Sequence, residues 1–121
     1  MKLSISLVPS ALTNPILDGT SRIEGIDLDT HVSKTVDSNS RAMLEGAFDV
    51  AEMSLATFVK GRAEGAPLIG LPIFTGRRFL EPGIGIREGA GISEPRELAG
   101  RRIGVPQFWM TSSVWHRAVL E

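Results

Sequence analysis

Cysteine is absent from the 121 residues of this chain. Its absence excludes disulfides, thiolate zinc sites and cysteine nucleophiles. Lysine and arginine never form a run longer than a pair, and the formal net charge is −1. Nucleic acids and anionic membrane surfaces are bound by clustered positive charge, so this balance argues against both as partners. A small molecule is the ligand that we expect instead.

Long apolar runs are also missing. A membrane-spanning helix needs about 20 consecutive apolar residues, and a secretory signal needs about 7–15 with a cleavage site of small residues. The first eight residues instead alternate, with Leu3, Ile5 and Leu7 apolar, which predicts a strand. We therefore expect no membrane span and, if Met1 is the true start, a cytoplasmic protein.

Strand and helix signals alternate through the first half of the chain. Strands are indicated by alternating or short apolar runs, and helices by capping residues such as Asp37, Ser40 and Ser54 ahead of a helical pattern. The order strand, helix, strand, helix, strand predicts a mostly parallel sheet flanked by helices, an α/β fold. The predicted segments are strand 3–7, strand 25–32, helix 41–45 with caps at 37–40, strand 47–50 and helix 55–62.

The second half is interpreted in the same way. The nearly apolar run 68–74 predicts a strand, placed at an edge because Pro72 cannot donate to a sheet. Thr111 or Ser112 is predicted to cap a last helix that is still amphipathic at Glu121. Such an ending is typical of a truncated sequence. The further predicted segments are extended 84–86, short helix 93–100 and strand 102–106.

Several blocks of sequence resemble, in order, proteins of the 4,5-dihydroxyphthalate decarboxylase kind. They are 48–55, 71–74 with Arg77 and Phe79, 91–106, and 110–117 with Met110, Thr111, Val114, Trp115 and Arg117. These proteins are relatives of the type II periplasmic solute-binding fold, in which two α/β lobes close over a ligand. The resemblance implies that residues 1–91 form the N-terminal part of lobe one. Residues 92–121 would then be the crossover and an incomplete start of lobe two.

The resemblance also implies a ligand site in the cleft between the lobes. A helix N-terminus presents free N–H groups and about half a positive charge, which suits a carboxylate ligand. Simple capping is the alternative role for each serine and threonine, and a solvated turn is the alternative for the arginine. The nominated substrate-binding residues are Ser54, Thr57, Arg77, Thr111, Ser112 and Ser113.

Glu52 is the candidate for proton chemistry. Decarboxylation of an electron-rich aromatic acid needs a general acid that protonates the ring carbon bearing the carboxylate. Glu52 stands between an apolar strand and an apolar helix face. Its alternative role is to accept N–H bonds at the start of the helix.

Two functions are therefore expected. The first is decarboxylation of a hydroxylated aromatic acid, without metal or cofactor, since neither His31 nor His116 has a partner at metal-ligand spacing. The second is a solute-binding protein of an ABC-type transporter for a small organic anion, without catalysis. That function would require export to the periplasm and a true start upstream. The full-length protein could form a homo-oligomer under either function.

Overall fold

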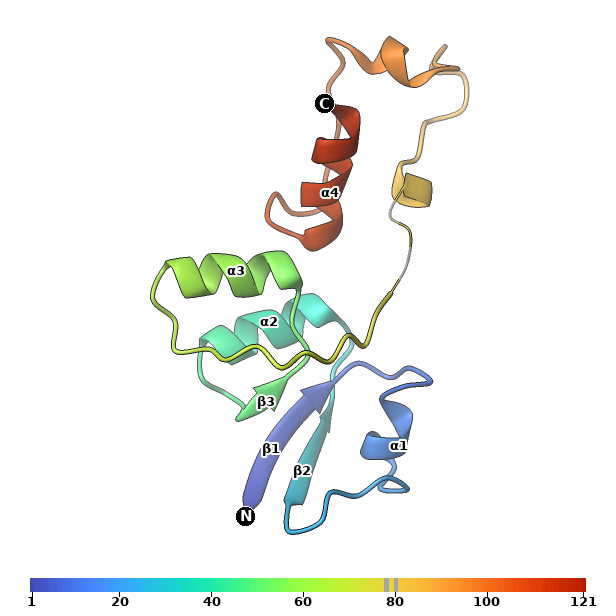
Figure 1. Ribbon diagram of the computed structural model, residues 1–121. Helices are drawn as coiled ribbons and strands as arrows, with labels where there is room; N and C mark the ends of the chain where they lie inside the picture. The colour runs from blue at the N-terminus through green and yellow to red at the C-terminus, as the bar shows by residue number, and fades with distance from the viewer. Residues whose placement is uncertain (78, 80) are drawn as a thin grey trace. The chain divides into compact units, whose positions relative to one another are not determined.

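The structure is a computed structural model that describes residues 1–77, 79 and 81–121. The chain divides into two compact units, Met1–Gly76 and Arg77–Glu121. The first unit carries the β-sheet and its helices, and the second carries one longer helix and two short 3-10 helices (Figure 1). The predicted lobe boundary at residue 91 belongs to a complete two-lobed fold and stays a prediction.

The sheet has three parallel strands in the order β2-β1-β3. β1 (Lys2–Leu7) pairs with β2 (Asp27–Val32) along its whole length and with β3 (Val50–Ala51) at its carboxyl end. The alternating apolar residues of β1 explain its central place, because Ile5 and Leu7 are both buried. The α/β class and the parallel sheet flanked by helices are confirmed, and they agree with part of a periplasmic-binding-like lobe.

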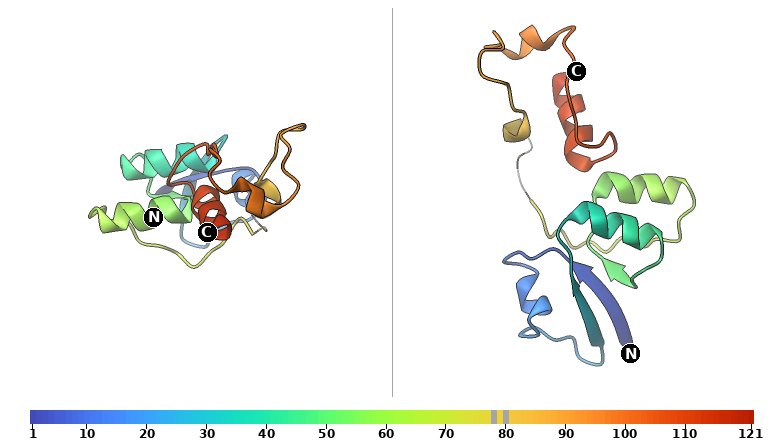
Figure 2. Two further views of the ribbon diagram at one scale, coloured as in Figure 1. Left: turned by 90° about the horizontal axis from the view of Figure 1, so that it is seen from above. Right: turned by 180° about the vertical axis from the view of Figure 1, so that it is seen from behind.

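Three helices accompany this sheet. α1 (Asn14–Leu17) contacts β2, whereas α2 (Val36–Leu44) and α3 (Leu55–Ala63) lie side by side (Figures 1 and 2). α2 is followed by its C-cap Glu45 and then by Gly46, whose positive φ of 74° lies in the left-handed region that glycine adopts without strain.

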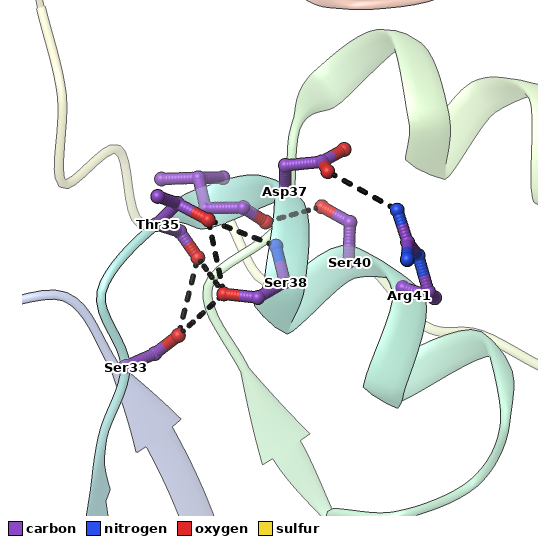
Figure 3. A network of polar contacts seen from close by, with 7 residues as sticks. Ser33, Thr35, Asp37, Ser38, Ser40 and Arg41 are labelled. Carbon is purple, nitrogen blue, oxygen red and sulfur yellow. Dashed lines mark hydrogen bonds and ion pairs between the residues drawn. The ribbon is translucent and has the colours of Figure 1, made fainter.

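The start of α2 differs from the prediction. Thr35 is the cap, and its hydroxyl accepts the N–H of Ser38 at 3.1 Å. The hydroxyls of Ser33 and Ser38 complete this network (Figure 3). The predicted caps at 37–40 are wrong, because these residues lie inside the helix. The capping position is occupied by Thr35, which accepts the free N–H of Ser38 in the first turn.

Two predicted strands are also wrong. Residues 68–74 and 102–106 form no strand in the structure. Leu68 is buried, but Ile69 is 89% exposed, so the apolar run is not covered on both faces. A strand needs a partner with free backbone groups, and neither run pairs with a strand among the described residues.

The second unit is built from local turns. It contains the 3-10 helices η1 (Glu81–Gly83) and η2 (Pro95–Leu98) and the helix α4 (Thr111–Leu120). η2 confirms a short helix within 93–100, where the Glu97 carboxylate accepts the N–H groups of Ser93 and Glu94 at 2.6 and 3.0 Å. In the part of the chain that the structure describes, no helix has the length and apolar character required for a membrane span.

Candidate functional site

The carboxyl edge of the sheet gathers the first group of predicted site residues. Ser6 in β1 pairs with Ala51 in β3, so Val8 and Glu52 leave the two strands beside each other. The N–H of Glu52 donates to the Ser6 carbonyl at 3.1 Å, which continues the pairing one residue beyond β3. The short parallel strand therefore places Glu52 at the edge where open α/β sheets bind ligands.

The Glu52 carboxylate is half-buried and receives one donor at each oxygen. The Val8 N–H donates to Oε2 at 3.1 Å, and the Thr75 hydroxyl donates to Oε1. Val8 is itself held in place, because its carbonyl accepts the buried Thr13 hydroxyl at 2.6 Å. Glu52 thus ties the loop after β1 to the segment that ends the first unit.

Ser54 and Thr57 lie at the start of α3. Ser54 is the N-cap residue, but its side chain makes no capping hydrogen bond within the described chain. Its backbone N–H donates to the Ser40 hydroxyl of α2 at 2.9 Å. Thr57 is half-buried in the first turn. The structure therefore brings Glu52, Ser54 and Thr57 to one edge of one unit. Their role in a ligand site stays a prediction.

Asn39 is a site-supporting residue that sequence reasoning missed. It is 1% exposed, its Oδ1 accepts the Ser6 hydroxyl at 2.7 Å, and its Nδ2 donates to the Ser6 carbonyl at 3.2 Å. Because the same Ser6 carbonyl accepts the Glu52 N–H, Asn39 holds in place the backbone group to which Glu52 is bonded. No local signal distinguishes such a residue from a helix cap, since its partner lies 33 residues away.

Asp49 anchors the approach to β3. The N–H and the hydroxyl of Ser4 both donate to its Oδ2 at 2.8 Å, and these bonds hold the pKa of Asp49 below its usual value. The Asp49 N–H in turn donates to the Ser4 hydroxyl at 3.0 Å. This reciprocal pair fixes β3 against β1 and so sets the position of Glu52 three residues later.

The remaining predicted site residues belong to the second unit. Arg77 is its first residue and is exposed. Met110, not Thr111 or Ser112, is the N-cap of α4, because the helix begins at Thr111, one or two residues earlier than predicted. Ser113 is 1% exposed, and its hydroxyl has no hydrogen-bond partner among the described residues. The predicted cleft joins residues of both units, and it stays a prediction.

The histidines lie in aromatic and backbone contacts. The ring of His31 lies 5.0 Å from the ring of Phe48, and His116 lies against Gly83. Within the described ranges, no three His, Asp or Glu side chains are grouped so that they could hold a metal ion. The carboxyl edge of the sheet offers the Glu52 carboxylate and the hydroxyls of Ser54 and Thr57.

Comparison with known proteins bears on that chemistry. The chain is similar over its whole length to two curated proteins named 4,5-dihydroxyphthalate decarboxylase, one from Comamonas testosteroni and one from Pseudomonas putida. Each is 34% identical over 122 residues, and the chain covers 37% of the first and 47% of the second. No family model matches the chain. The predicted resemblance is confirmed, and the chain spans less than half the length of these relatives.

Proposed function

We propose that this chain belongs to a decarboxylase of a hydroxylated aromatic acid of the 4,5-dihydroxyphthalate type. The observation that carries the proposal is the half-buried Glu52 at the carboxyl edge of the sheet, two residues before Ser54, the N-cap of α3. The similarity to two proteins named for that activity supports the reaction class. Such an enzyme would act in the cytoplasm.

In the proposed reaction Glu52 is the general acid. Its proton forms the new C–H bond at the ring carbon that bears the carboxylate. The bond from that carbon to the carboxylate then breaks, carbon dioxide leaves, and the bonding electrons return to the ring, which regains aromaticity. Glu52 afterwards takes a proton from solvent, so the cycle balances.

The substrate's carboxylates require donors. On the Glu52 side we assign Ser54 and Thr57 at the start of α3, where helix N–H groups and dipole favour an anion. On the other side we assign Arg77 as a bidentate clamp and the first turn of α4. The buried hydroxyl of Ser113, which has no hydrogen-bond partner in the part of the chain that the structure describes, supports that last assignment. Thr111 and Ser112 precede it in the same turn.

The test is carbon dioxide release from 4,5-dihydroxyphthalate by the purified full-length protein. We expect Glu52→Gln to lower kcat by about 10²–10⁴-fold, because the amide cannot supply the proton. Glu45→Gln, an exposed glutamate just after α2, is the matched control and should leave kcat unchanged. A folded wild type that releases no carbon dioxide would overturn the proposal.

One observation favours a second function. Both oxygens of Glu52 already accept protein hydrogen bonds, which suits a residue that only shapes a binding site. The full-length protein would then be a periplasmic solute-binding protein that delivers a small organic anion to a transporter. It would bind phthalate in a calorimetric titration without releasing carbon dioxide from the hydroxylated acid.

A further inference from the structure

Thr75 is the one side-chain donor to the Glu52 carboxylate among the described residues. It lies 23 residues after Glu52, in the segment between α3 and the end of the first unit. Its hydroxyl contacts Oε1, while the backbone N–H of Val8 contacts Oε2. One donor at each oxygen fixes the plane of the carboxylate, which would otherwise rotate in a broad torsional well.

The two donors differ in whether an amino-acid substitution can remove them. Any residue except proline supplies the N–H at position 8, whereas the bond at Oε1 depends on a hydroxyl at position 75. A hydroxyl also both donates and accepts, so Thr75 can stay bonded to Glu52 when the carboxyl group carries a proton and after it has lost it. The Val8 N–H can only donate.

We propose that Thr75 is a positioning residue that holds the carboxyl group of Glu52 in the orientation needed for proton transfer. The proposal rests on the proposed decarboxylase function. Thr75 acts through Glu52, so its loss should impair the chemical step more than the binding of substrate.

The kinetic test compares Thr75→Val, Thr75→Ser and the control Thr30→Val, a half-buried threonine of β2. We expect Thr75→Val to lower kcat by about 10–10²-fold with little change in KM, and Thr75→Ser and Thr30→Val to keep wild-type values. In a Glu52→Gln background, Thr75→Val should cause no further loss, because two residues that act as a unit are not additive. A rise in KM alone, or full additivity, would overturn the proposal.

A second readout does not depend on activity. The NMR signal of the Val8 amide reports the bond to Oε2, so reorienting Glu52 should shift it. We expect Thr75→Val to move this signal in the full-length protein, and Thr75→Ser to restore it. An unmoved signal would overturn the positioning role even in an active enzyme. If the wild type releases no carbon dioxide, the decarboxylase proposal fails, and the Val8 signal alone decides whether Thr75 orients Glu52.

Discussion

Each of the two units of this chain has its own internal polar bonds, and these bonds span different distances along the sequence. In the first unit, side chains of Asp49, Asn39 and Glu52 bond to β1 and the residue after it across 33 to 45 positions of sequence. In the second unit, Glu97 and Arg117 bond to groups only four and nine positions away. The first unit therefore depends on the sheet for its shape, and the second depends on its turns.

Burial of apolar side chains follows the same division. Ile5, Leu7 and Leu68 are the buried large apolar residues among those described, and all belong to the first unit. Because apolar burial is the main favourable term in folding, the first unit should carry most of the free energy of unfolding.

The largest expected effect comes from the same change made once in each unit. Ile5→Ala removes a side chain that is 8% exposed, and Ile103→Ala removes one that is 50% exposed. We expect Ile5→Ala to lower the free energy of unfolding by about 2–5 kcal/mol and Ile103→Ala by less than about 0.5 kcal/mol. Urea unfolding followed by circular dichroism measures both. Equal losses would contradict the division between the units.

A smaller effect is expected from the buried hydrogen bonds between Asn39 of α2 and Ser6 of β1. Asn39→Ala leaves both the hydroxyl and the carbonyl of Ser6 without this buried partner, which should cost about 1–3 kcal/mol. Asn14→Ala, at the exposed start of α1, is the matched control and should change stability by less than about 0.5 kcal/mol. A neutral Asn39→Ala in the same urea assay would show that Ser6 finds another partner.

Sequence patterns predicted the first unit well where the signal is local. The alternation in β1 and β2 is a property of a few neighbouring residues, and both predicted strands are present. β1 begins at Lys2, one residue earlier than predicted, and β2 begins at Asp27, two residues later than predicted. The prediction of a strand at 68–74 failed because apolar character indicates only that a segment can be buried. It does not indicate which strand would pair with that segment. Ile69 and Ile73 in that run are exposed, so the apolar composition of a segment does not by itself predict that its side chains are buried.

The site was predictable in part for the same reason. Glu52 and Ser54 follow a short strand at the start of a helix, a local pattern that identifies the carboxyl edge of a sheet. Asn39, Thr75 and Ser40 were not predictable, because each matters through a partner on another segment. In a helical context Asn39 and Ser40 resemble caps, and only their partners show their roles: Ser6 of β1 for Asn39, and the N-cap residue Ser54 of α3 for Ser40.

The smallest expected effect comes from removing, one at a time, two carboxylates whose pKa values are both lowered by hydrogen bonds, Asp49 in the first unit and Glu97 in the second. Ser4 lowers the pKa of Asp49 across 45 positions, whereas Ser93 and Glu94 lower the pKa of Glu97 within one turn. A lowered pKa in the folded state stabilises the fold above the unfolded value, about 3.9 for an aspartate, and this stabilisation is lost as the pH falls through the folded value.

We therefore expect Asp49→Ala to lower the urea midpoint at pH 7 and to match the wild type once the pH is below both values. Glu97→Ala should change the midpoint less at pH 7, because its bonds close only a local turn and breaking them leaves the sheet intact. Urea midpoints measured from pH 7 downwards for both variants provide the check. An Asp49→Ala effect that persists unchanged at low pH would mean that Asp49 stabilises β3 through packing, not through the charge that Ser4 binds.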